Sequence, residues 1–152
     1  MADPRRQLVR AHRNTPFVEV FAVTDAAGAP LDLTGYSAAM QVRLYGMQPG
    51  DPLLDLSTVE TALTHGLTIS GSDVIAYADR IELAFMPDAP VAGVDVRFHY
   101  DLLLTAPDGY FWVERWGAFD LADGVTADPQ TFLTTETGAI LVTADGKYLE
   151  AA

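Results

Sequence analysis

The side chains that could do chemistry in this sequence are few and scattered. His12, His65 and His99 show none of the spacings that bind zinc, and the absence of cysteine excludes disulfides and thiolate metal sites. His99 and Asp101 would lie on one face of a strand and resemble half of an acid–base pair. No nucleophile motif accompanies them, so we interpret them as a cross-strand polar pair. The sequence therefore predicts no catalytic site, no bound metal and no cofactor.

Aspartates are numerous in the second half of the chain. Most of them fall in predicted turns, where a carboxylate supports the backbone, and their order does not match a calcium-binding loop. Two carboxylates across a cleft, as a glycosidase uses, remain possible in so acidic a chain, but no motif favours them. The GxSxG, GxxxxGK[ST] and GxGxxG motifs are all absent. A hydrolase is therefore the least favoured class.

Four aromatic residues between Tyr110 and Trp116 offer a different chemistry. Tyr110, Phe111, Trp112 and Trp116 could form a platform on which sugar rings stack. Their alternation along the chain favours a place in the core and at an interface instead. A carbohydrate-binding module is kept as an alternative function.

Charge is distributed unevenly along the chain. The net charge is −12, yet Arg5, Arg6, Arg10 and Arg13 are four of only nine basic residues. From Asn14 onward, five basic and 20 acidic residues give −15. Such a body repels nucleic acids and anionic membranes, so neither is an expected partner. We expect residues 1–14 to form a basic arm whose four arginines bind an acidic protein neighbour; the alternative is a solvated terminus.

The sequence also bears on localisation. No apolar run near the N-terminus resembles a signal peptide, so export by the ordinary secretory route is not expected. No stretch approaches the roughly 18 consecutive apolar residues of a membrane span. The chain is expected to fold in a cytoplasm.

The clearest structural signal is a hairpin over Val96–Leu121. Phe98, Tyr100, Leu102 and Leu104 alternate with polar residues, which predicts a strand with one buried face. Ala106-Pro107-Asp108-Gly109 then predicts a type I turn followed by a left-handed glycine. Further strands are predicted elsewhere: Phe17–Thr24, Ala38–Tyr45, Leu53–Leu56, Gly66–Ile69, Val74–Tyr77 and Ile81–Phe85.

Short strands separated by glycine and proline turns indicate an all-β domain. We expect a two-sheet antiparallel β-sandwich, immunoglobulin-like or jelly-roll-like, over residues 15–126. The arm before it is expected to hold at most a short helical turn at Arg5–Arg10.

Residues 127–152 form a C-terminal extension with a small repeat. Thr135–Val142 and Thr143–Glu150 align at a spacing of eight, and each unit reads as a turn ending in glycine plus a short strand. Two such units cannot bury a core, so we expect a β-hairpin that binds a partner or packs on its own domain. The residues expected to do so are Phe132, Leu133, Ile140, Val142, Tyr148 and Leu149.

Thr15–Thr126 resembles the N-terminal β-sandwich domain of siphophage baseplate upper proteins, a family of tailed-phage virion proteins. The matching stretches are Phe17–Tyr36, Ala39–Leu44, Leu53–Ser57, Gly66–Gly71, Ile81–Leu83 and Tyr100–Gly109, followed by Gly117 and Val125-Thr126. The likeness covers about three quarters of the chain. It implies a non-enzymatic structural protein of a phage particle, made in the bacterial host cytoplasm.

Within a virion the resemblance leaves two places open. The first is the tail, as a baseplate or fibre-adaptor subunit; the alternative is the head, as a decoration (cement) protein that stabilises the capsid. In either place the partners would be other virion proteins, tail or major capsid protein. A homo-oligomer, plausibly a trimer, would cover the edges of the C-terminal extension.

The C-terminal extension generates the first testable prediction. Deleting residues 131–152 should leave a folded chain that no longer oligomerises, because the deleted segment supplies interface and no core. Circular dichroism and light scattering measure the two effects. A truncated chain that unfolds, or one that still assembles, would contradict it.

Overall fold

The fold is almost entirely β. The computed structural model describes residues 5–61, 65–88 and 95–123. One short helix, α1, spans Arg80–Ala84. The strands are β1 (Arg5–Arg6), β2 (Val9–His12), β3 (Phe17–Ala22), β4 (Ser37–Arg43), β5 (Leu54–Ser57), β6 (His65–Ser70), β7 (Asp73–Ala78), β8 (Val96–Thr105) and β9 (Phe111–Ala122). The all-β prediction is confirmed.

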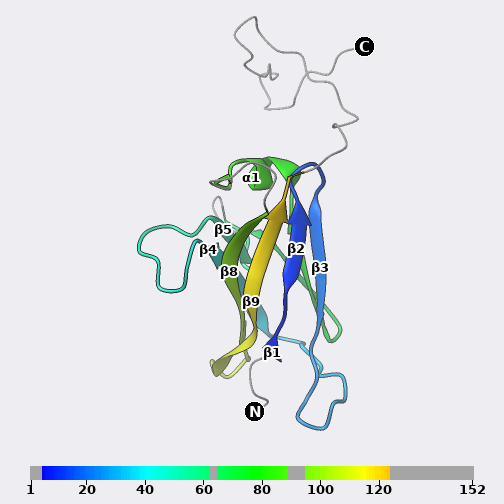
Figure 1. Ribbon diagram of the computed structural model, residues 1–152. Helices are drawn as coiled ribbons and strands as arrows, with labels where there is room; N and C mark the ends of the chain where they lie inside the picture. Colours follow the sequence, from blue (N-terminus) through cyan, green and yellow to red (C-terminus); the bar gives the residue numbers. More distant parts are fainter. Residues whose placement is uncertain (1–4, 62–64, 89–94, 124–152) are drawn as a thin grey trace, which may run out of the picture.

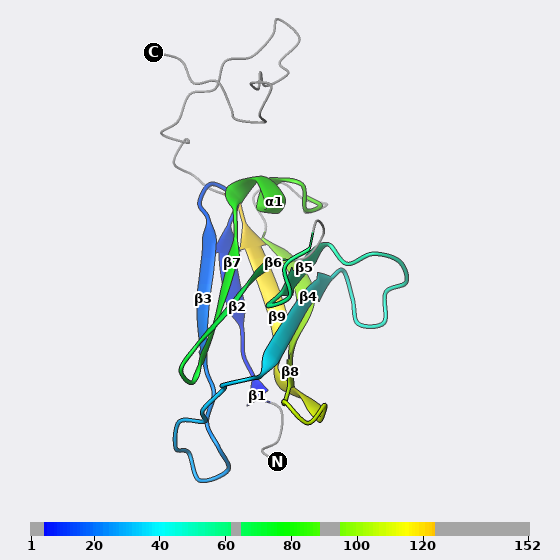
Figure 2. The same ribbon diagram turned by 180° about the vertical axis from the view of Figure 1, so that it is seen from behind.

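The strands form one curled, mixed sheet. Its order is β1-β9-β8-β4-β5-β6-β7-β3, and β2 also pairs with β9 (Figures 1 and 2). The pairs β1–β9, β2–β9 and β5–β6 are parallel, so the prediction of purely antiparallel pairing is wrong for them. The continuous hydrogen-bonded path also differs from the two separate sheets that were expected. It runs through the short β5–β6 pair, which holds the two halves together.

The curl buries one face of each strand in a common core. Phe17 of β3 meets Phe119 of β9 edge-on, with ring centroids 5.3 Å apart. Phe21 and Tyr100 form a second contact across the interior at 6.2 Å. The core comes from the alternating apolar positions that the sequence predicts, including Phe17, Phe21, Met40, Val42, Phe98 and Leu102.

The β8–β9 hairpin is confirmed. It also contains an irregularity that was not predicted. Gly109, at φ +90°, donates to the Ala106 carbonyl oxygen at 2.9 Å, as expected for the turn. Farther along, Leu102 pairs with Arg115 and Leu103 with Val113, so Glu114 is the extra residue of a β-bulge. As a result, the side chains of the two consecutive residues Glu114 and Arg115 are both buried.

The strand predicted at Ile81–Phe85 is wrong, because these residues belong to α1 and its C-terminal cap. Asp79 accepts hydrogen bonds from the backbone of Ile81 and Glu82, and the Glu82 side chain accepts one in return from the Asp79 backbone. This capping box supplies the partners that the first turn of a helix lacks. Leu83 is buried, whereas Phe85 is 86% exposed.

The N-terminal segment is part of the sheet. The helical turn predicted at Arg5–Arg10 is wrong: β1 and β2 run parallel to β9, and the amide of Gln7 between them donates to the Trp116 carbonyl oxygen at 2.9 Å. Val9 and Ala11 point into the core while Arg10 is exposed. The arm defined by charge is therefore, from residue 5 on, structurally continuous with the domain. The C-terminal extension over residues 127–152 lies outside the described residues.

A substitution at Gly117 of β9 tests how closely the N-terminal segment packs against that strand. It has φ +151°, and a Cβ there would lie 2.6 Å from the Gln7 carbonyl oxygen. Gly117→Ala should lower the free energy of unfolding by about 1–3 kcal/mol, because both the backbone strain and the contact must be relieved. Urea denaturation measures the loss.

Gly46→Ala is the matched control, since nothing lies within 4 Å of a Cβ at that position. It should change stability by no more than about 0.5 kcal/mol. Equal effects of the two substitutions would show that the close approach of Gln7 does not matter.

Candidate functional site

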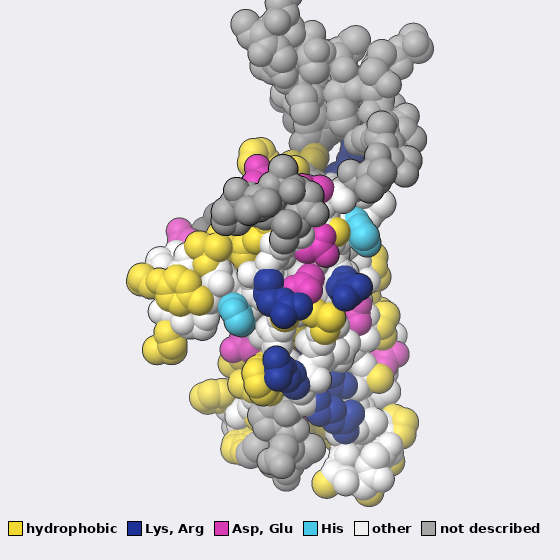
Figure 3. Space-filling model, in the orientation of Figure 1, with side chains coloured by type: hydrophobic (Ala, Val, Ile, Leu, Met, Phe, Trp, Pro, Cys, Tyr) yellow, Lys and Arg dark blue, Asp and Glu magenta, His cyan; other side chains and the backbone are white. Residues whose placement is uncertain are grey.

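Arginine side chains gather on one outer face of this acidic protein. Side chains alternate along β2, β8 and β9, so Arg10, Arg97 and Asp120 lie on the sheet face opposite the core. Arg10 and Arg97 are exposed there, whereas Asp120 is only 7% exposed. Arg6 and Trp116 are paired in register farther along the same face. We call these five residues the basic face; Figure 3 shows the Lys and Arg side chains of this side of the molecule. Its three arginines contrast with a chain of net charge −12.

Asp120 lies between two of these arginines. It pairs in register with Arg10 of β2 on one side and with Arg97 of β8 on the other. Arg97 donates through Nε and Nη2 to the two carboxylate oxygens, both at 2.8 Å. These bonds lower the pKa of Asp120 below its ordinary value; burial opposes them, and the charges of Arg97 and Arg10 add to the lowering. The bidentate pair holds the exposed Arg97 guanidinium in a fixed orientation.

Arg6 and Trp116 form the other end of the basic face. The guanidinium carbon of Arg6 lies 5.5 Å from the centroid of the Trp116 ring, a cation–π contact. The ring itself remains 44% exposed. Exposed tryptophan and arginine side chains are the residue types most enriched at the centres of protein interfaces. This end of the face therefore combines apolar area with positive charge.

The other two arginines predicted to bind a partner have contacts within the chain. Arg5 donates to the Thr24 hydroxyl. Arg13 donates to the carbonyl oxygens of Met86 at 2.8 Å and Pro87 at 2.6 Å, and its Nε lies 2.8 Å from an Asp123 carboxylate oxygen. The Arg13 side chain is only 13% exposed. The structure thus brings Arg6 and Arg10 together with Arg97 and places Arg13 elsewhere. The six C-terminal residues predicted to bind a partner, Phe132, Leu133, Ile140, Val142, Tyr148 and Leu149, lie outside the described residues.

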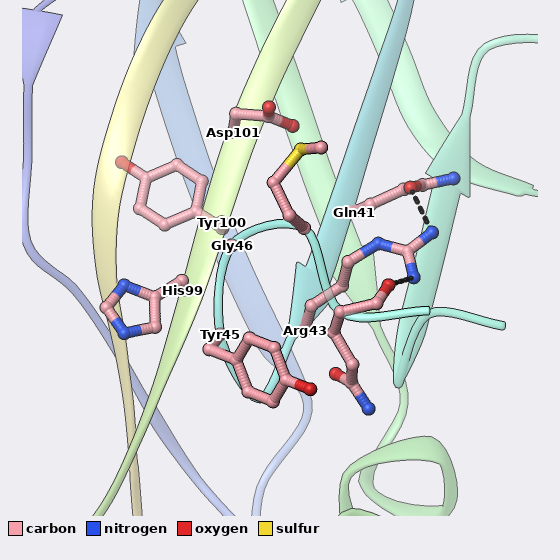
Figure 4. Close-up of a pocket in the computed structure, with 9 residues that line it drawn as sticks. Gln41, Arg43, Tyr45, Gly46, His99, Tyr100 and Asp101 are labelled. Atoms are coloured by element: carbon pink, nitrogen blue, oxygen red, sulfur yellow. Dashed lines mark hydrogen bonds between the residues drawn. The ribbon is translucent and has the colours of Figure 1, made fainter. Parts of the chain in front are cut away.

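A hollow of about 430 Å³ adjoins the basic face, between β4, β8 and the loop that follows β4 (Figure 4). Arg43 stabilises this loop, donating to the carbonyl oxygens of Gln48 at 2.9 Å and Gly50 at 2.7 Å. His99 lies opposite Arg43 in the β4–β8 register, and Asp101 lies opposite Gln41. The two residues therefore face polar cross-strand neighbours, as the sequence predicts.

The chemistry of this hollow is limited by what lines it. Burial raises the pKa of Asp101 above its ordinary value, and the charge of Arg43 opposes this shift. The guanidinium of Arg43 is already bonded to the loop and to the Gln41 side chain at 3.1 Å. No serine, threonine or cysteine is among the lining residues. An acid–base pair here would have no serine, threonine or cysteine of the lining to activate and would have to act on water or on a bound molecule.

The four aromatic residues of the β9 segment do not form a common platform. Tyr110 and Trp112 contact each other with ring centroids 5.9 Å apart, whereas Trp116 belongs to the basic face. Phe111 is 65% exposed and therefore lies outside the core. Trp112 alone packs partly against the core.

A polar cluster in the interior was not among the predicted sites. Arg115 is paired with Glu114, donates to the Ala22 carbonyl oxygen at 2.6 Å, and donates to the Gln7 side chain at 3.1 Å. The available signal was the broken alternation at Glu114-Arg115, where two charged residues interrupt a run of apolar positions. Within the residues that the structure describes, no three histidine or acidic side chains are grouped to hold a metal ion. Nor does a helix of the described part have the length and apolar character to cross a membrane.

Asp120 provides a pH test of the basic face. Asp120→Asn should lower the free energy of unfolding at pH 7 by about 1–3 kcal/mol, because it removes charge-assisted hydrogen bonds from Arg97. Since the folded-state pKa of Asp120 is lowered, its stabilisation is present above about pH 4 and is lost as the pH falls through that pKa. The difference between variant and native chain should therefore shrink between pH 7 and about pH 2.5 in urea denaturation.

Asp51→Asn, in an exposed loop, should show no such pH-dependent difference. A destabilisation of Asp120→Asn that stays constant over the whole pH range would mean that the carboxylate charge contributes nothing.

Comparison with known proteins gives no assignment. No protein-family model matches this chain, and no curated protein has significant sequence similarity to it. The likeness to phage baseplate proteins therefore stays a prediction, and the functional argument depends on the residues themselves.

Proposed function

We propose that this chain is a non-enzymatic structural subunit of a tailed-phage particle, and that its basic face binds an acidic surface of a neighbouring virion protein. The observation that carries the proposal is the grouping of Arg6, Arg10, Arg97 and Trp116 on one exposed sheet face of a chain with net charge −12. Opposite charges steer the two surfaces together and fix their relative orientation.

A protein surface fits this face better than a nucleic acid does. The strongly acidic remainder of the chain would repel a phosphate backbone over most approaches. Asp120 also lies between Arg10 and Arg97, where a continuous row of phosphates would meet a carboxylate. A protein partner can place separate carboxylates against the exposed arginines and leave the buried Asp120 in its pair with Arg97.

The resemblance to baseplate proteins favours the tail as the place in the particle. We propose a tail, baseplate or fibre-adaptor subunit, with head decoration as the alternative. Quantitative mass spectrometry of purified particles separates the two, because hundreds of copies indicate the head and tens or fewer the tail. In either place we propose a homo-oligomer, plausibly a trimer, held in part by the apolar residues of the C-terminal extension.

We also propose that the curled sheet is folded into the two packed layers of a β-sandwich. One layer would hold β1, β2, β9, β8, β4 and β5, and the other β6, β7 and β3. The contacts between Phe17 and Phe119 and between Phe21 and Tyr100 support this division, because they join the two groups of strands across the interior. The basic face is then the outer surface of the first layer.

The proposal predicts that Arg6→Gln combined with Arg10→Gln reduces incorporation into particles. Both side chains are exposed, so the isolated fold should stay intact while the attraction to an acidic partner falls. Quantitative mass spectrometry of particles from a complemented deletion strain should show roughly tenfold lower occupancy, the effect of about 1.4 kcal/mol. The residual binding should weaken further with salt.

Arg80→Gln is the control, because it removes a positive charge from α1 and not from the basic face. It should leave occupancy unchanged. Equal occupancy of the double variant and the native chain would overturn the proposed role of the basic face.

A further inference from the structure

A second hollow, of about 250 Å³, lies at the turn end of the β8–β9 hairpin. It is formed between the segment that follows β3, from Thr24 to Leu31, and the start of β9. Figure 1 shows the β3–β4 connection and this hairpin at the same end of the molecule. We call it the hairpin-end hollow. No residue of the basic face lines it.

Aromatic rings form one wall of the hairpin-end hollow. The Tyr110 and Trp112 rings lie 5.9 Å apart at 34° to each other, and Tyr36 contacts Trp112 edge-on at the same centroid distance. The indole Nε1 of Trp112 donates to Glu114 Oε2 at 3.0 Å. The Trp112 ring is thus held from two directions and presents a fixed apolar surface.

Polar groups with fixed positions form the rest of the lining. Glu114, only 6% exposed, lines the hollow because the β-bulge turns it inward. It forms an ion pair with Arg115, and each oxygen of a carboxylate can accept more than one hydrogen bond. At the rim, Asp25 is oriented by the amides of Ala27 and Ala29, at 2.9 and 3.0 Å.

We propose that the hairpin-end hollow binds one pyranose ring of a saccharide. The C–H face of such a ring is apolar and packs on an aromatic wall, while its hydroxyl groups donate to carboxylates such as Glu114 and Asp25. The pairing with Arg115 offsets the charge of Glu114, which favours a neutral polyol over a cation. The volume is slightly below the roughly 300–1,000 Å³ of pockets for drug-sized ligands, so it suits a single ring.

Tryptophan fluorescence of the full chain tests this site directly. Trp112 and Trp116 are the only tryptophans, so the variant Trp116→Phe reports on the hollow alone and Trp112→Phe on the basic face alone. The probes are the methyl glycosides of glucose, galactose, mannose and N-acetylglucosamine, each titrated to about 50 mM. At least one should change the Trp112 emission saturably, with a Kd on the order of 1 mM, and leave the Trp116 emission unchanged.

A pair of neighbouring substitutions then locates the contact. Tyr110→Ala removes part of the aromatic wall and should raise the Kd roughly tenfold, whereas Phe111→Ala, whose ring does not line the hollow, should leave it within about twofold. The proposal is overturned if no glycoside changes the Trp112 emission, if Trp116 responds instead, or if Phe111→Ala weakens binding as much as Tyr110→Ala. The proposal is independent of the virion role, since Tyr110→Ala changes no residue of the basic face.

Discussion

Hydrogen bonds of Gln7, the residue between β1 and β2, hold the curled sheet together across its interior. Its amide binds the Trp116 carbonyl oxygen at 2.9 Å, and its own carbonyl oxygen accepts from Tyr100 Oη at 2.9 Å. Its side chain accepts from Arg115 and donates to Glu19 of β3, both at 3.1 Å. One residue thus connects β8, β9 and β3, although β9 and β3 are not hydrogen-bonded neighbours in the sheet. Burial in this cluster raises the pKa of Tyr100 to about 12, so its hydroxyl stays a donor even above the ordinary tyrosine pKa of about 10.

The bulge at Glu114 determines both candidate sites. Before it, Trp112 lies opposite the buried Leu104; after it, Trp116 lies opposite the exposed Asp101. Without the extra residue, the two tryptophans would share one face of β9, because their positions differ by an even number. The bulge therefore places one tryptophan in the hairpin-end hollow and the other on the basic face. It also turns two opposite charges inward together, where each compensates the other.

The sequence predicted the elements whose signal is local. The β8–β9 hairpin and β4 were predictable because alternation and turn chemistry lie within a few residues of each other. Ile81–Phe85 also alternates, but the capping box at Asp79 and Glu82 favours a helix, and a five-residue apolar pattern does not distinguish the two. The parallel strands β1 and β2 escaped prediction because their partner, β9, lies about a hundred residues away. For the same reason Arg6 and Arg10 were predicted as binding residues, but their grouping with Arg97 was not.

The two candidate sites differ in the forces that would act in them. On the basic face, binding would depend on exposed charges, whose attraction is screened over about 10 Å at ordinary salt. In the hairpin-end hollow, the charges of Glu114 and Arg115 are buried and already paired, so an uncharged ligand would be held by stacking and hydrogen bonds that salt barely affects. Because Trp112 and Trp116 lie on opposite faces of β9, a partner that covers the basic face leaves the hollow open. The fold can therefore hold a protein neighbour by one face while an end of the molecule remains available to a second ligand.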